Sequence, residues 1–257
     1  MEPRFIGGSR RTEARDPKLP DDVLPTDLDR GIRKELDSLP MAAAEDVARH
    51  LVMAGRVMDD DPQTALLHAR AARRRAGRVA AVREAVGIAA YLCEEWTEAL
   101  SELRAVRRMT GTNEVVPMLA DCERALGRPE RALDLLAGVT GTISNELAIE
   151  LLLVQAGARS DLGQDAAALA LLRGPAEKAK GKGSHVARLR YAYADILLDS
   201  GDTAGAAAWF ARALDADVDS VTDASERVED LLGVVYEDLD EGEEETDESL
   251  ESGSTSE

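Results

Sequence analysis

A pattern of small and large residues that recurs every 33 to 38 positions is the feature that most constrains the fold of this chain. A small alanine recurs five times, at Ala65, Ala99, Ala132, Ala168 and Ala206. Five residues before each alanine lies a turn position, occupied by Asp60, Glu94, Gly127, Gly163 and Gly201. Four residues after each alanine lies Ala69, Leu103, Leu136, Leu172 or Phe210. A period of this length, with two helices in each unit, predicts an all-α solenoid of helical hairpins.

The most regular unit, residues 191–217, shows why a hairpin is expected. Apolar residues recur at helical spacing up to Leu198, and Ser200-Gly201-Asp202 then interrupts the run. A second helical run follows from Ala206 to Leu214. The glycine relaxes the turn, and the small alanine lets two helix backbones approach closely. Aromatic residues make up only 3% of the chain, and no run alternates with the period of a strand, so we expect no β-sheet.

These residues resemble the tetratricopeptide repeat (TPR). The best matches are Ala194/Gly201/Ala206/Phe210/Ala213 and Ala156/Gly163/Ala168/Leu172. The resemblance covers residues 40–217 and implies a right-handed α-solenoid of about five repeats with capping helices. The sequence departs from the family where Asp60 and Glu94 replace the turn glycine, and where Arg83 and Arg190 replace an early aromatic residue. The whole chain also resembles a group of actinobacterial TPR proteins that have an arginine-rich start and an acidic end.

The flanks of the repeats predict caps and disordered ends. Residues 1–26 are rich in proline and charge, so we expect a disordered, weakly basic arm. Residues 27–39 predict a capping helix before the solenoid of residues 40–217. A second capping helix is expected within residues 218–239, where an apolar face is formed by Val228, Leu231, Leu232, Val235 and Leu239. Residues 240–257 are expected to form a disordered acidic tail.

Charge is distributed unevenly. The formal net charge is −19, and residues 237–257 carry eleven acidic residues and no basic one, which leaves −8 for the rest. The tail could keep the protein soluble, fold back on the arginine cluster of residues 70–83, or contact a basic partner. The start of the chain lacks an apolar signal core and no stretch is apolar enough to span a membrane, so we expect a cytoplasmic protein.

The chemical motifs of enzymes are missing from the sequence. The three histidines lie in separate units, and Cys93 and Cys122 are too far apart in sequence to indicate a metal site. The stretch Gly181-Lys182-Gly183-Ser184 lacks the glycine and the Lys-Ser/Thr pair of a phosphate-binding loop. We therefore expect no enzymatic activity, no cofactor and no metal, and we expect both cysteines to be structural thiols.

The densest positive cluster lies early in the chain. It comprises Arg70, Arg73, Arg74, Arg75, Arg78 and Arg83. Such residues can form a solvated helix face, or they can bind a protein, a phosphate group or a nucleic acid. Because no aromatic residues are interleaved to stack on bases, the sequence favours nucleic acid least.

In TPR proteins the first helix of each repeat lines an inner groove, so the resemblance implies a partner there. The residues expected to point into the groove are His50, Asp121, Arg124, Asp161, Tyr191, Asp195 and Asp199. Its several carboxylates could accept a basic peptide, or they could be ordinary solvated positions. The leading hypothesis is a scaffold that binds an unidentified protein or peptide. The alternative is a nucleic-acid-associated or regulatory protein that uses the Arg70–Arg83 cluster.

Overall fold

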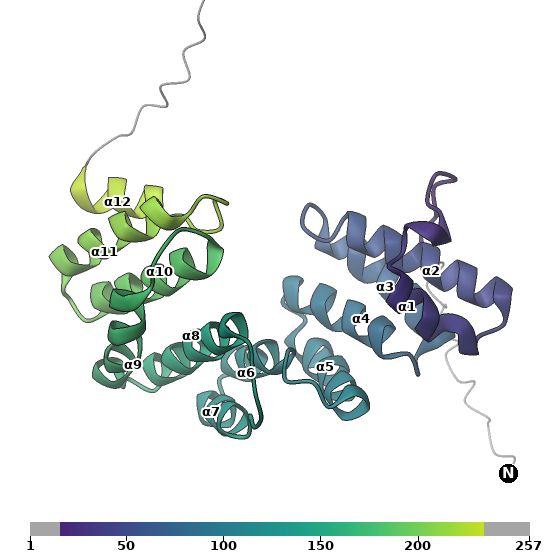
Figure 1. Ribbon diagram of the computed structural model, residues 1–257, viewed down its shortest axis with the longest axis horizontal. Coiled ribbons are helices and arrows are strands. Elements are labelled where there is room, and N and C mark those ends of the chain that lie inside the picture. The colour runs from purple at the N-terminus through teal and green to yellow at the C-terminus, as the bar shows by residue number, and fades with distance from the viewer. Residues whose placement is uncertain (1–15, 234–257) are drawn as a thin grey trace, which may run out of the picture.

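The computed structural model describes residues 16–233, which form five helical hairpins in chain order along an arc (Figure 1). The hairpins are α2 (Met41–Arg56) with α3 (Pro62–Ala76), α4 (Ala80–Leu92) with α5 (Trp96–Thr110), α6 (Val116–Ala125) with α7 (Pro129–Ala137), α8 (Asn145–Asp161) with α9 (Asp165–Lys178), and α10 (Ser184–Asp199) with α11 (Thr203–Ala216). No strand occurs within residues 16–233. The expected all-α solenoid of about five hairpins is confirmed.

The turn inside each hairpin explains the pattern of glycines. Gly127, Gly163 and Gly201 have φ angles of 71°, 68° and 87°, in the left-handed region that favours glycine. Glu94 occupies the same position with φ 60°, although a non-glycine residue is strained there. In the first hairpin the turn residue Asp60 does not have a positive φ, and the carboxylate of Asp61 caps α3 by accepting a hydrogen bond from the backbone N–H of Thr64.

Small residues lie where the two helices of a hairpin meet. The five recurring alanines, Ala65, Ala99, Ala132, Ala168 and Ala206, are all completely buried. In the second hairpin a small residue of the first helix, Gly87 of α4, faces α5. A Cβ atom added at Gly87 would lie 2.6 Å from Leu103 Cδ2 on α5. The helices are therefore close because these side chains are small, and larger residues fill the space on either side.

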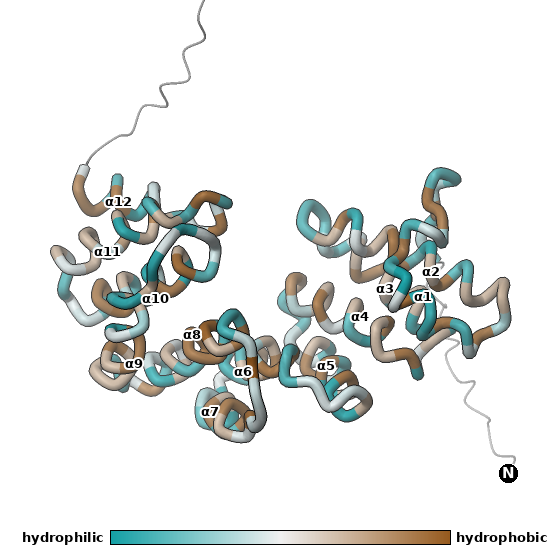
Figure 2. Tube along the Cα trace, in the orientation of Figure 1, coloured by the Kyte–Doolittle hydropathy of each residue, from teal (hydrophilic) through white to brown (hydrophobic). Residues whose placement is uncertain are grey.

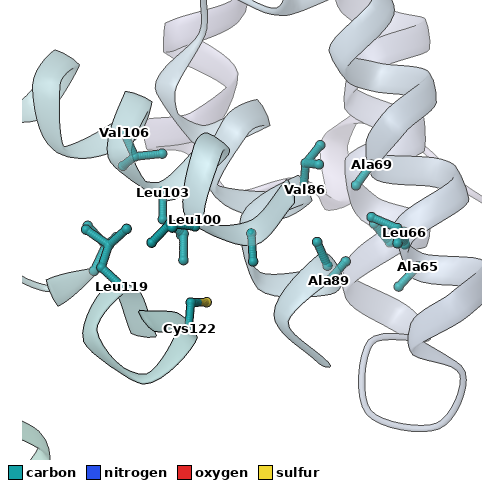
Figure 3. Close-up of a cluster of buried hydrophobic side chains, with 14 residues drawn as sticks. Ala65, Leu66, Ala69, Val86, Ala89, Leu100, Leu103, Val106, Leu119 and Cys122 are labelled. Atoms are coloured by element: carbon teal, nitrogen blue, oxygen red, sulfur yellow. The ribbon is translucent and has the colours of Figure 1, made fainter. Parts of the chain in front are cut away.

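The core continues from one hairpin to the next. Figure 3 shows one buried cluster of this core. It includes Ala65 and Leu66 of α3, Val86 of α4, Leu103 of α5 and Leu119 of α6. Hydrophobic residues are interspersed with hydrophilic ones along the helices (Figure 2). This continuity is typical of a solenoid, in which a hairpin buries its apolar surface against its neighbours.

The N-terminal end is covered by more of the chain than expected. A short helix, α1 (Arg30–Glu35), is flanked by the 3₁₀ turns η1 (Pro25–Asp27) and η2 (Leu36–Ser38), and Leu36 is buried. The expectation that residues 1–26 form a disordered arm is wrong for residues 16–26. Val23 is fully buried, and Arg49 of α2 donates hydrogen bonds to the carbonyl oxygens of Pro20 and Val23, both 2.8 Å long. Residues 1–15 lie outside the described part.

The C-terminal end is covered by α12 (Ala224–Leu232). Val228 is fully buried against the last hairpin, whereas Leu232 is exposed, so only part of the expected apolar face is used. Val235, Leu239 and the acidic tail lie beyond the described residues. Among the helices of residues 16–233, none is both long enough and apolar enough to cross a membrane.

The contact at Gly87 yields a stability prediction. In a Gly87→Ala variant the new methyl group would overlap Leu103, which is fully buried. We expect the free energy of unfolding to fall by about 1–3 kcal/mol, measured by urea denaturation. Gly55→Ala is the matched control, because its Cβ atom would meet nothing within 4 Å and should raise helix stability by about 0.5–1 kcal/mol. Equal effects at both sites would contradict the close approach of α4 and α5.

Candidate functional site

A cleft of about 350 Å³ crosses the first helices of four successive hairpins. In Figure 1, α6 and α8 lie between α4 and α10 on the inner side of the arc. The cleft, called the inner cleft below, is lined by Tyr91, Pro117, Met118, Asp121, Arg124, Glu150, Leu153, Val154 and Arg188. It contains two of the residues expected to point into the groove, Asp121 and Arg124.

A chain of hydrogen bonds connects the polar residues at this site. The Tyr91 hydroxyl donates to Asp121 Oδ2 at 2.6 Å, and Arg124 Nη1 donates to Asp121 Oδ1 at 2.8 Å. Arg124 also reaches the next hairpin, where Nε donates to Asp161 Oδ2 at 2.8 Å. The structure therefore brings together three of the expected groove residues, Asp121, Arg124 and Asp161, and adds Tyr91 of α4. We expect the four to act as one rigid unit.

The environment of Arg124 keeps it charged and fixes its position. Burial opposes its charge, but hydrogen bonds and the negative charges of Asp161 and Asp121 outweigh burial and raise its pKa. Its guanidinium group lies against Gly157 of α8, where an added Cβ atom would come within 2.5 Å of Arg124 Cζ. Gly157 thus leaves the space in which Arg124 bridges two hairpins. Burial and the hydrogen bond to Asp121 raise the pKa of Tyr91, so its hydroxyl stays a donor.

The other half of the inner cleft combines an ion pair with apolar side chains. Arg188 of α10 lies 2.6 Å from Glu150 of α8. Met118, Leu153 and Val154 are each only partly buried, so their apolar surface is accessible beside these charges. A surface with apolar side chains between fixed charges suits the binding of a peptide, because burial supplies affinity and the charges supply orientation.

The expected groove residues on α10 lie near the C-terminal cap. Tyr191 stacks edge-on against Phe210 and accepts a hydrogen bond from Arg227 Nε of α12 at 3.2 Å. Arg227 Nη2 also lies 3.6 Å from Asp195, whereas Asp199 is exposed. Burial and the neighbouring charge of Asp199 raise the pKa of Asp195. The α12 helix therefore occupies part of the surface that was expected to be open.

The expectation that His50 points into the groove is wrong. Its side chain is 2% exposed and lies between α2 and α3, where its Nδ1 atom is 2.9 Å from Nδ1 of His68. One ring must donate its proton and the other must accept it, so this contact requires at least one neutral imidazole. His50 faces inward, and its hydrogen-bond partner His68 lies on the facing helix α3.

The basic cluster of residues 70–83 is largely neutralised by carboxylates. Arg70 pairs with Glu98, Arg74 and Arg75 pair with Asp16, and Arg75 Nε also lies 2.6 Å from Asp46 Oδ2. Arg73 and Arg83 both bind Glu102, as described next. Arg78 is exposed and forms no ion pair within residues 16–233. The cluster is therefore a set of ion pairs that holds α3 to its neighbours, and its net positive charge is small.

Two buried glutamates are structural features that the sequence did not reveal. Glu102 of α5 is 3% exposed and lies between Arg73 Nη2 at 2.6 Å and Arg83 Nη1 at 2.7 Å. Glu123 of α6 is fully buried and lies between Arg104 and Arg128. The sequence pattern that could have indicated these contacts is a common spacing. Arg83 precedes Glu102 by 19 residues, and Arg104 precedes Glu123 by 19 residues. A buried carboxylate is tolerated because two guanidinium groups compensate its charge.

Both cysteines of the chain lie within the described residues, and their surroundings disfavour the thiolate. Burial raises the pKa of the Cys122 thiol to about 12, and it also raises the pKa of Cys93, so both cysteines favour the neutral form. Within residues 16–233, no three His, Cys, Asp or Glu side chains come close enough to hold a metal ion.

Comparison with known proteins identifies the fold. No protein-family model matches the chain, and no curated protein matches it. The structure is similar to that of TTC0263, a thermophilic TPR protein in Thermus thermophilus, with a TM-score of 0.58 and 17% sequence identity. The match covers 73% of this chain and 100% of that chain. The chain thus has a TPR-like fold.

The buried histidine pair predicts a loss of stability in mild acid. Burial lowers the pKa of His50, and burial together with the charge of His50 lowers the pKa of His68 to about 4. The unfolded chain binds these protons near pH 6.5, so acidification through the interval between about 6.5 and about 4 favours unfolding. Between about pH 7 and about pH 5, we expect His68 to cost the folded state about 2 kcal/mol, measured by urea denaturation.

A His68→Gln variant provides the control for this effect. It removes the titrating group, so its unfolding free energy should depend less on pH over the same interval. Identical pH dependence in the variant and the parent chain, or an NMR titration of His68 near pH 6.5, would contradict the prediction.

Proposed function

We propose that this chain is a protein-interaction scaffold that binds a peptide segment of a partner in the inner cleft. The observation that carries the proposal is the cleft itself, which runs across α4, α6, α8 and α10 and so spans four hairpins. An extended segment lying along it could contact each hairpin in turn, in the way that solenoids use long concave surfaces. We also propose that the chain is not an enzyme, since the polar groups of the cleft are held in ion pairs and hydrogen bonds.

The charges along the inner face favour a basic partner. Five carboxylates lie along it, from Asp121, Glu150, Asp161, Asp195 and Asp199, and three arginines face them, Arg124, Arg188 and Arg227. The excess negative charge would attract lysine or arginine side chains, and like charge would disfavour acidic segments. Met118, Leu153 and Val154 supply an apolar surface for one anchoring side chain. The proposed ligand is therefore a basic peptide with an apolar residue.

The alternative of nucleic-acid binding receives little support from the geometry. Binding to phosphate requires cations that are free to displace counterions. Five of the six arginines of the basic cluster instead form ion pairs with Asp16, Asp46, Glu98 or Glu102. We therefore favour a protein partner.

A selection from a random peptide library tests the proposal. We expect the selected peptides to be basic with an apolar residue, and to bind the full chain with a Kd that rises at high salt. Leu153→Ala should weaken binding about tenfold, equivalent to about 1.4 kcal/mol, because it removes an apolar contact in the cleft. The matched control is Leu67→Ala, a change at an exposed leucine of α3. Selected peptides that bind the Leu153 variant as tightly as the parent chain would overturn the proposal.

A further inference from the structure

A second cleft, of about 410 Å³, lies between α5 and the turn that joins α6 to α7. Four of its residues form one stripe along α5, because Thr97, Ser101, Arg104 and Arg108 are spaced at i, i+4, i+7 and i+11. Leu126 and Arg128 lie opposite, next to the turn. Figure 1 places α5 and α7 on the outer side of the arc, and this cleft shares no lining residue with the inner cleft. This outer cleft is therefore separate from the inner cleft and independent of the function proposed for it.

The outer cleft carries more positive charge than the described residues neutralise. Arg104 and Arg128 share a single carboxylate, Glu123, which is fully buried beneath them. Both arginine side chains remain about half exposed, at 47% and 46%. Arg108 is also exposed, and it has no ion pair within residues 16–233. Three guanidinium groups thus face one carboxylate, in contrast to the cluster of residues 70–83, where carboxylates offset most of the charge.

The chemistry of the outer cleft fits carboxylate side chains. Guanidinium groups donate paired hydrogen bonds to carboxylates, and the hydroxyls of Thr97 and Ser101 can donate further ones. Because Glu123 fixes Arg104 and Arg128, less side-chain entropy is lost when a ligand binds. Among the described residues that line this cleft none is aromatic, so it offers no surface on which a nucleic-acid base could stack. An acidic peptide segment is the ligand that these groups favour.

We propose that the outer cleft binds an acidic segment through Arg104, Arg108 and Arg128, and that this segment is the chain's own residues 237–257. That segment has eleven acidic residues and no basic one. The 24 residues after Gly233 could extend to about 80 Å. Five helix-to-helix steps of about 8–10 Å separate α7 from α12, or about 50 Å in all, so the segment is long enough to reach the cleft.

Small-angle scattering of the full chain at two salt concentrations tests this contact. An unbound polyanionic tail extends at low salt through self-repulsion and contracts as salt screens it. A bound tail makes the molecule more extended as salt rises, because salt weakens the attachment of the tail to the arginines and releases it. We expect the radius of gyration to increase between about 10 mM and about 1 M salt, over which the Debye length falls from about 30 Å to about 3 Å.

Arg108→Glu is the decisive variant, since Arg108 does not hold Glu123 and can be changed without leaving that buried charge unpaired. Its radius of gyration should fall as salt rises. Arg131→Glu makes the same charge change at an exposed site on α7 outside the cleft, and should behave like the parent chain. Equal salt responses in the parent chain and the Arg108 variant would overturn the proposal. Light scattering completes the test, because a constant mass supports binding of the chain's own tail, whereas a mass increase at low salt would indicate a second copy and overturn the proposal.

Discussion

The close contact of two helices at small side chains is the constraint on which the rest of the structure depends. Each hairpin closes where a fully buried alanine lies between its helices, from Ala65 in the first hairpin to Ala206 in the last. Large residues such as Leu103 and Phe210 fill the space one turn further along. Because this contact fixes which side of each helix faces inward, it also determines that α4, α6, α8 and α10 present Tyr91, Arg124, Glu150 and Arg188 to a common cleft.

Ion pairs of arginine are the second kind of interaction that holds the structure together, and they join helices of successive hairpins. Glu102 joins α5 to Arg73 of α3 and Arg83 of α4, and Arg124 joins α6 to Asp161 of α8. Removing an arginine partner of the buried Glu102 would leave a costly unpaired charge, so this bridge specifies how the first two hairpins are placed. The ion pairs also explain why a chain with 26 arginines has little free positive charge on α3 and α4.

The fold was predictable from the sequence because its signal is periodic and local. The turn position at Gly127, Gly163 and Gly201 and the alanine five residues later could be counted without knowing any distant contact. The site was less predictable because its polar contacts join residues far apart in sequence. Tyr91 meets Asp121 across 30 residues, and Arg124 meets Asp161 across 37.

Three departures from expectation have the same origin. His50 is buried because His68, on the facing helix, is its hydrogen-bond partner, and no pattern within α2 indicates this. Residues 16–26 are held by Arg49 and by Arg74 and Arg75, whose carboxylate and carbonyl partners composition alone does not identify. The cluster of residues 70–83 looked like a basic surface because its counter-charges lie elsewhere in the sequence. They are Asp16, Asp46 of α2, and Glu98 and Glu102 of the next hairpin.

The most direct measurement of the central contact compares two substitutions on α11. Ala206 is fully buried between α10 and α11, whereas Ala208 on the same helix is exposed. Aspartate at either position costs the same helix propensity, so a difference in unfolding free energy isolates burial at the contact. If the buried alanines close the hairpins, Ala206→Asp should lose several kcal/mol more than Ala208→Asp, on the order of 3 kcal/mol. Equal losses in the two variants would contradict the account.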